Sequence, residues 1–296
     1  MARGTANGKT FKIKNKIRRE EVVGKYRDMV NKERHKKRAA RAREEAQNPE
    51  LKKERLEQNV PSTIENMREY DESVGAEVEG EDEFAEYFDE GVKPKVLITT
   101  NVGARKQADK FAEMLQEIIP DSTFIARKPQ FTIKHMAEFS TNRDFTDLII
   151  LNEDKKKING ITFIHLPAGP TFYFSVSSVV YPEKIPGHGK PTSHVPELVL
   201  NNFTTRLGKT VGRLFQALFP QQPDFRGRQV VTLHNQRDFI FFRRHRYIFR
   251  NEEKVGLQEL GPQFTLRLKR MQRGIREEVE WEHRPEMDKE KKKFYL

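Results

Sequence analysis

Two distant stretches of the chain share one hydrophobic pattern. Each begins with a short apolar run typical of a buried strand, passes through a turn, and then shows apolar residues at helical spacing before a proline. The first stretch comprises residues 95–100 (KVLITT) and 105–119, and the second comprises residues 197–200 and 206–219. The repetition predicts a duplicated half-domain, with roughly a hundred residues between the two copies.

Further strands are predicted between and after these stretches, because short β-branched and aromatic runs are bounded there by turn residues. Strands that alternate with helices favour an α/β fold, here with a mixed sheet and packed helices in each half. The additional strands are expected at residues 123–126, 147–151, 161–166, 171–180 and 261–269.

Residues 227–249 combine strand-forming residues with a high density of arginine. The pattern predicts a β-hairpin, with strands over residues 230–233 and 239–249 and turn residues at 235–238. Alternation along the second strand gives two faces, and neither is apolar enough to be entirely buried. One face holds Phe241, Arg243, His245, Tyr247 and Phe249, and the other holds Ile240, Phe242, Arg244, Arg246 and Ile248.

Four arginines lie within eight residues of this hairpin and would repel one another unless an anion is near or water screens them. Guanidinium groups fork onto phosphates and stack on bases, and interleaved aromatic rings add stacking planes, so RNA is the expected ligand. The alternative is a charge-protected sheet edge whose arginine stems cover apolar neighbours. The residues are Arg243, Arg244, Arg246 and Arg250, with Tyr247 as a stacking ring.

A second group of cations lies on the helix predicted over residues 206–219. Its spacing puts three cations on one face, away from the apolar stripe, although a solvated helix face is the simpler alternative. The charges of residues 201–276 sum to about +11, so we expect RNA to bind the second half. The predicted RNA contacts are Arg206, Lys209, Arg213, Arg226, Arg228, Arg237, Arg243, Arg244, Arg246, Tyr247 and Arg250.

The N-terminal third carries two opposite charge runs: residues 1–60 sum to about +10 and residues 61–93 to about −10. The basic run has few apolar residues, so we expect a solvated helix or a segment that orders on binding, acting as an RNA-binding arm and nucleolar address or only as a solubilising tail. In the acidic run, Phe84, Tyr87 and Phe88 are spaced like the anchors of a short docking helix. The acidic residues are expected to shield the basic surface, to contact a basic partner or to form a plain linker.

Composition bounds the whole chain. In 296 residues, 33% charged residues and a mean hydropathy of −0.81 are too polar for one compact globule, so part of the chain should be solvated. A net charge of +11 and a pI near 9.6 favour an acidic partner, either nucleic acid or an anionic membrane surface. No apolar run is long enough to span a membrane, and no signal sequence is visible, so we expect a soluble intracellular protein. The absence of cysteine excludes disulfides, thiolate zinc sites and cysteine nucleophiles.

Catalytic chemistry has little support in the sequence. Residues 186–192 (PGHGKPT) lack the glycine spacing and the hydroxyl of a phosphate-binding loop. The histidines are scattered without metal-ligand spacing, so no metal, cofactor or catalytic residue is predicted. A nuclease carboxylate pair formed by Asp144 and Asp147 stays open as a hypothesis, although Asp147 fits a strand border better. The linear sequence also does not exclude a Ser–His–Asp arrangement.

Four segments together resemble the Brix-domain family of ribosome assembly proteins. They are residues 95–101 (KVLITTN), 197–220 (ELVLNNFTTRLGKTVGRLFQALFP), 230–249 (VVTLHNQRDFIFFRRHRYIF) and 259–274 (ELGPQFTLRLKRMQRG), and the resemblance extends over about residues 94–274. It implies two similar α/β halves and a non-catalytic factor of the nucleus and nucleolus, bound to precursor ribosomal RNA of the large subunit within a pre-ribosomal particle. Members of this family usually work in a pair with another assembly protein.

The expected organisation is a basic extension (1–60), an acidic linker (61–93), a Brix domain (94–275, with halves at about 94–160 and 161–275) and a charged tail (276–296). The tail is expected either to pack back on the domain or to stay solvated. Two rival functions remain: a docking scaffold whose basic face binds an acidic protein, and an RNA-processing enzyme that uses Asp144 and Asp147.

Overall fold

The computed structural model describes residues 4–6, 9–11, 13–70, 83–251, 254–290 and 292–296. Their contacts divide the chain into two units, Met1–Met67 and Arg68–Leu296. The acidic segment is expected to shield the basic surface, to contact a basic partner or to form a linker. Its residues 71–82 lie outside the described residues. Within the described ranges, no helix combines the length and apolar character needed to cross a membrane.

One long helix, α1, dominates the first unit. Its N-terminus is capped by the side chain of Asn15, which accepts a hydrogen bond from the N–H of Arg18 at 3.2 Å. Val23 is the one buried residue of this helix, so α1 is a solvated helix, one of the two forms predicted from its charge. The elements of this unit are β1 (Gly4–Ala6), β2 (Lys9–Phe11), α1 (Lys16–Gln47) and α2 (Pro49–Gln58).

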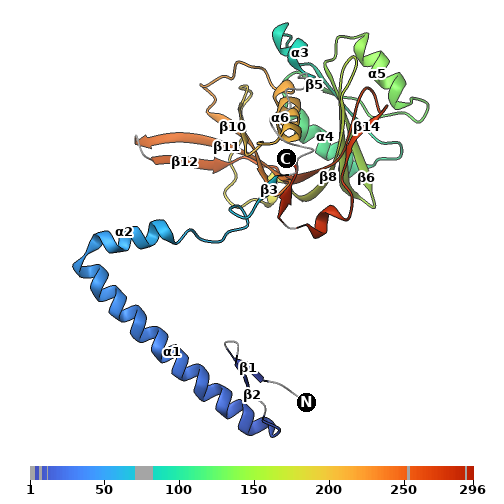
Figure 1. Ribbon diagram of the computed structural model, residues 1–296. Coiled ribbons are helices and arrows are strands. Elements are labelled where there is room, and N and C mark those ends of the chain that lie inside the picture. The colour runs from blue at the N-terminus through green and yellow to red at the C-terminus, as the bar shows by residue number, and fades with distance from the viewer. Residues whose placement is uncertain (1–3, 7–8, 12, 71–82, 252–253, 291) are drawn as a thin grey trace. The chain divides into compact units, whose positions relative to one another are not determined.

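An 11-stranded sheet organises the second unit (Figure 1), in the order β5-β4-β6-β7-β8-β13-β11-β10-β9, with β12 paired to β11 and β14 to β13. β4 is parallel to β5 and β6, and β9 is parallel to β10, whereas the other neighbours are antiparallel. The predicted α/β class with a mixed sheet is confirmed. The strands are β4 (Val96–Thr100), β5 (Ser122–Phe124), β6 (Asp147–Asp154), β7 (Lys157–His165), β8 (Thr171–Val180), β9 (Glu197–Asn201), β10 (Gln229–Gln236), β11 (Phe239–Asn251), β12 (Lys254–Glu259), β13 (Gln263–Gln272) and β14 (Val279–Glu282).

The predicted division into halves near residue 160 falls inside β7, and the sheet continues through it. The halves therefore stay a prediction about a duplicated unit. The two strand–helix pairs are β4 with α4 (Lys106–Ile118) and β9 with α6 (Arg206–Ala217), and they share one sheet.

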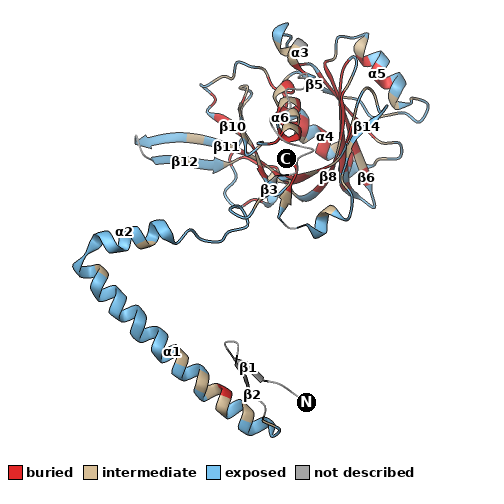
Figure 2. Ribbon diagram, in the orientation of Figure 1, coloured by how far each residue is buried: buried red, intermediate tan, exposed pale blue. Residues whose placement is uncertain are grey.

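Helices cover the two faces of this sheet unequally (Figure 2). α4 and α6 pack on the face of the larger core, which includes Ile98 and Val231, while α5 packs on the opposite face over a smaller core around Leu97. Because β4 is buried on both faces, its sequence is a continuous apolar run; β10 alternates because only one of its faces is buried. The helices are α3 (Ala85–Asp89), α4 (Lys106–Ile118), α5 (Ile133–Thr141) and α6 (Arg206–Ala217), with 3₁₀ turns η2 (Pro182–Lys184) and η3 (Met287–Lys289).

The turn between β10 and β11 and the helix α5 differ from the sequence-based expectations. Arg237 and Asp238 both have positive φ, 55° and 63°, and form a two-residue turn, so β10 continues to Gln236 instead of ending near residue 233. Helix α5 was not predicted, because its buried positions are few and include the polar Ser140.

Part of the acidic linker is folded onto the second unit. Phe84 is completely buried, and the hydroxyl of Tyr87 donates a hydrogen bond to the backbone oxygen of Ala217 at 3.2 Å. The guanidinium of Arg213 lies 4.7 Å from the centre of the Phe88 ring. The predicted docking helix is confirmed as α3, and its docking surface is this chain's own domain.

The last described residues also pack on this unit. β15 (Lys293–Phe294) pairs in parallel with β3 (Glu69–Tyr70). The carboxylate oxygen Oδ1 of Asp238 accepts hydrogen bonds from the backbone N–H groups of Tyr295 and Leu296 at 2.7 and 2.9 Å. Burial raises the pKa of Asp238, and these two N–H groups partly oppose that rise. Of the two forms expected for the tail, the packed one is present.

Candidate nucleic-acid interface

β11 and β12 extend beyond the body of the second unit as a two-stranded ribbon (Figure 1). Its pairing runs from His245 opposite Glu259 to Asn251 opposite Lys254, and most of its residues are exposed (Figure 2). We call this pair of segments the ribbon. Sequence reasoning missed β12, although its alternating KVGLQE sequence carries a weak strand signal.

One face of the ribbon is aromatic and aliphatic. Tyr247 and Phe249 lie opposite Leu257 and Val255, and the two rings are 5.4 Å apart at an angle of 69°. Phe249 is 66% exposed, which leaves its ring open to a base. The hydroxyl of Tyr247 donates a hydrogen bond to the carboxylate of Glu197, and this bond raises the pKa of Tyr247 and holds its ring in place.

The other face of the ribbon is cationic. Arg246 and Arg250 are both exposed on it, and neither has a carboxylate within salt-bridge distance among the described residues. A Cβ at Gly256 would lie 3.0 Å from Nε of Arg250, so the glycine leaves room for that guanidinium. Unpaired, solvent-facing guanidinium groups on a projecting element can fork onto phosphate oxygens.

Two further cations lie at the base of the ribbon. Arg228, just before β10, is exposed, and its backbone oxygen accepts the N–H of Tyr247 at 2.9 Å. The side chain of Arg243 is 34% exposed; it donates to the backbone oxygen of Phe242 at 2.8 Å and lies 3.9 Å from Glu259. We name the resulting set the ribbon surface: Arg228, Arg243, Arg246, Tyr247 and Arg250.

Arg244 is a correction to the predicted contacts, because it lies inside the protein. It is 2% exposed, and its guanidinium donates to Oε1 of Glu117 in α4 at 3.1 Å and to Oε1 of Gln229 at 2.9 Å. Burial lowers the pKa of this guanidinium, which Glu117 opposes. The side chain shares a face with Ile240 and Phe242, and α4 covers that face. Arg244 therefore joins α4 to the sheet, and we exclude it from the RNA contacts.

The cations of α6 form a separate group. Arg206, Lys209 and Arg213 project from a helix that packs on the sheet face opposite Arg243 and Tyr247. Lys209 is exposed, but Arg213 is engaged with the ring of Phe88 in α3. The predicted continuous surface is thus divided by the sheet.

Arg237 and Arg226 also lie apart from the ribbon tip. Arg237 is in the turn at the opposite end of β11, a strand of 13 residues, which corresponds to roughly 40 Å of extended chain. Arg226 is exposed but pairs with Asp224 at 3.1 Å. Both cations are therefore less suited to share one RNA segment with the ribbon surface.

The carboxylates considered for catalysis have separate surroundings. Asp147 is buried, accepts a hydrogen bond from the hydroxyl of Thr146 at 2.8 Å and lies 2.9 Å from Nδ1 of His165. Asp144 is exposed in the preceding turn. In the part of the chain that the structure describes, no cluster of three or more His, Cys, Asp or Glu residues is placed to hold a metal ion. His165 is a strand residue whose Nδ1 is paired with Asp147.

A family described as "Brix domain" matches residues 103–270 of the chain. The chain belongs to the Brix-domain family. The matched region contains α4, the whole β9–α6 pair and the whole ribbon, so the exposed cations and rings described above lie within the region that defines the family.

Close relatives cover nearly the whole chain. "Ribosome production factor 1" of Saccharomyces cerevisiae is 60% identical, with 98% of this chain and 100% of that protein aligned. The mouse protein of the same name is 46% identical over 96% of this chain and 84% of its own length. A crystal structure of a probable ribosomal biogenesis protein from Aeropyrum pernix K1 aligns with a TM-score of 0.43 and 14% identity, covering 59% of this chain and 96% of that one.

Proposed function

We propose that this Brix protein is a ribosome biogenesis factor that binds precursor ribosomal RNA of the large subunit in the nucleolus. The relatives named Ribosome production factor 1 support the biogenesis role. The observation that carries RNA binding is the ribbon, where the exposed, unpaired guanidinium groups of Arg246 and Arg250 and the open ring of Phe249 occupy a projecting element. That combination suits a polyanion with stackable bases.

On this proposal the ribbon holds RNA and does not react with it. Arg246 and Arg250 contact phosphates from one face, while Phe249 and the edge of Tyr247 offer stacking planes on the other. The RNA segment therefore lies along or around the ribbon instead of across the whole sheet. The buried hydrogen bonds of Asp147 with Thr146 and His165 are consistent with a structural role for that carboxylate and a non-catalytic factor.

The N-terminal unit supplies a second RNA contact. α1 has 32 residues, a length of roughly 48 Å, and its basic cluster from Arg34 to Arg43 is exposed. A helix without a core of its own gains a partner by binding a phosphate backbone. Such a cluster also fits a nuclear or nucleolar address.

The salt dependence of RNA binding tests the proposal. Simultaneous Arg228→Ala, Arg246→Ala and Arg250→Ala substitutions are expected to lower the slope of log Kd against log salt by about 2 to 3, because each phosphate contact releases counterions. Fluorescence anisotropy with in vitro transcribed fragments of large-subunit precursor RNA measures this slope.

The matched control replaces Lys155, Lys156 and Lys157, exposed cations at the β6–β7 turn, with alanine. It removes the same charge from a turn that β8 and β13 separate from β11 in the sheet order. If both variants shift the slope equally, net charge and not the ribbon governs binding, and the ribbon contact is disproved.

A further inference from the structure

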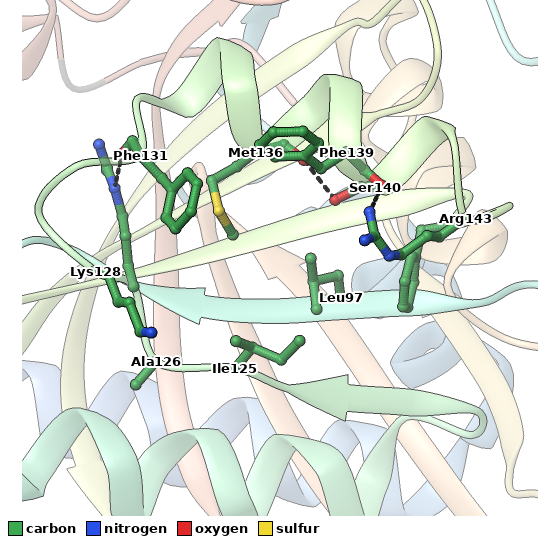
Figure 3. A pocket seen from close by; sticks show the side chains of 11 residues that line it. Leu97, Ile125, Ala126, Lys128, Phe131, Met136, Phe139, Ser140 and Arg143 are labelled. Atoms are coloured by element: carbon green, nitrogen blue, oxygen red, sulfur yellow. Dashed lines mark hydrogen bonds between the residues drawn. The ribbon is translucent and has the colours of Figure 1, made fainter.

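A pocket of about 430 Å³ opens beside α5, on the face of the sheet opposite α4 and α6 (Figure 3). Side chains from α5 and the loop before it face Leu97 of β4 and Ile125, just after the edge strand β5. Two of the large apolar residues are substantially open to solvent, Ile125 at 52% and Phe139 at 46%. The large apolar residues of the lining are Leu97, Ile125, Phe131, Met136, Phe139 and Phe145.

Cations surround this apolar floor. Lys128 and Arg143 lie at opposite ends of the pocket (Figure 3), and Arg127, which precedes Lys128 in the chain, also lines it. Arg127 and Arg143 each donate one hydrogen bond to a backbone oxygen, at 2.9 and 3.0 Å, which orients the guanidinium and leaves its other N–H groups available. Within the described ranges, none of the three cations has a carboxylate within salt-bridge distance.

Further cations lie near Arg127. Burial, Arg127 and Arg270 together lower the pKa of Arg276, while Arg270 itself pairs with Glu282. A surface that collects positive charge around an open apolar hollow is complementary to an amphipathic, negatively charged ligand.

The apolar floor of the pocket distinguishes between two negatively charged ligands, a nucleic acid that inserts a base and a protein segment that inserts an apolar side chain. Ser140 carries the one side-chain hydroxyl of the lining, and that hydroxyl already donates to the backbone oxygen of Met136 at 2.7 Å. The lining holds no carboxylate or amide side chain, so the N–H donors of a nucleobase would find no side-chain acceptor apart from the Ser140 hydroxyl and would lose their hydrogen bonds to water. Leucine, methionine and phenylalanine side chains have no hydrogen bonds to water to lose when they enter the pocket.

We propose that this pocket is a docking site for an acidic segment of a partner protein, which inserts one or two large apolar side chains while its carboxylates pair with Arg127, Lys128 and Arg143. The proposal does not depend on RNA binding by the ribbon: in the sheet order, β5 lies at one end and the strands β11, β10 and β9 at the other. Separate regions of the Brix domain would then engage protein and RNA.

Photocrosslinking from the pocket tests this docking site. The full chain is produced in cells with p-benzoylphenylalanine in place of Phe139, irradiated and purified, and the adducts are sequenced by mass spectrometry. The expected adduct is a protein peptide in which Asp or Glu residues flank a large apolar residue. Arg127→Glu with Lys128→Glu should reduce its yield by at least about fivefold, because like charges then meet across the interface.

Two controls make the result decisive. Lys155→Glu with Lys156→Glu applies the same charge change to an adjacent exposed pair away from the pocket, and it should leave the adduct intact. Ile125→Ser removes an exposed apolar contact without changing charge, and it should lower the yield while the thermal unfolding temperature stays unchanged. Adducts with RNA alone, a peptide without carboxylates, a yield indifferent to charge reversal or no adduct at all would each overturn the proposal.

The RNA affinity of the Arg127→Glu, Lys128→Glu variant separates this proposal from that of the ribbon. We expect that variant to bind precursor RNA fragments as tightly as the Lys155→Glu, Lys156→Glu control, because both carry the same net charge. A selective loss of RNA affinity in the pocket variant would show that the pocket binds RNA and not protein.

Discussion

Arg244→Ala is expected to lower the free energy of unfolding by about 3 kcal/mol, whereas Arg246→Ala should change it by less than about 0.5 kcal/mol. The first substitution removes a buried stem and two hydrogen bonds, and it leaves the amide oxygen of Gln229 without its donor. The second removes an exposed side chain two residues along the same face. Urea denaturation of both variants measures the difference.

RNA binding should respond in the opposite order. Arg246→Ala is expected to reduce the slope of log Kd against log salt by about 1, the value for one phosphate contact. Arg244→Ala, measured at a temperature where it remains folded, should keep the wild-type slope. A loss of about 3 kcal/mol in the Arg246→Ala variant as well would mean that Arg246 is buried. An unaltered slope in Arg246→Ala would remove it from the RNA contacts.

These two arginines also show how far the sequence could predict the site. Alternation correctly grouped Arg244 with Ile240 and Phe242, and this grouping pointed to burial, but residue type was given more weight and favoured the surface. The deciding partner is Glu117, 127 positions away in the chain. A local pattern contains no information about such a contact.

The division of the predicted cationic surface has a similar cause. Helical spacing correctly put Arg206, Lys209 and Arg213 on one face of α6, and alternation correctly put Arg243 and Tyr247 on one face of β11. Whether the two faces coincide depends on which side of the sheet the helix covers, which the connection between α6 and β10 and the packing of the core determine. Neither local periodicity reports this.

Strong periodicity predicted the larger elements well, and weak periodicity failed. The strands β4, β6, β7, β8 and β13 and the helices α4 and α6 were predicted near their observed positions because each buries a long regular set of apolar residues. Helix α5 has few buried positions, and β12 contains Gly256 and two exposed apolar residues. The pocket beside α5 was therefore invisible in the sequence, since one of its walls was not predicted.

The N-terminal boundary of the folded unit was predicted at residue 94, yet Phe84 is among the most deeply buried large side chains. Its ring centroid is 4.8 Å from that of His165 and 6.5 Å from that of Phe172. The spacing of Phe84, Tyr87 and Phe88 indicated docking, but the net charge around them favoured a linker, so the boundary was placed after these three aromatic residues. We therefore propose that the folded unit includes α3.

Phe84→Ala is accordingly expected to lower the free energy of unfolding by about 3 to 4 kcal/mol, through lost burial and the cavity left against Phe172 and His165. Phe84→Leu, which refills most of that volume, should lose about half as much or less. Phe88→Ala is the matched control, because its ring is only partly buried and contacts Arg213 at the surface, so we expect a loss near 1 kcal/mol, about the size of a cation–π contact with limited burial.

Chemical denaturation of the full chain, followed through the single tryptophan Trp281, measures all three variants. Trp281 packs against the core of the second unit, so its emission reports the unfolding of that unit rather than of α1. Equal, small losses for Phe84→Ala and Phe88→Ala would contradict the anchor and return the boundary to residue 94. A large loss for Phe84→Ala alone would mean that a fragment beginning at residue 94 lacks part of its own core, because the ring that fills the space beside His165 comes from the acidic segment.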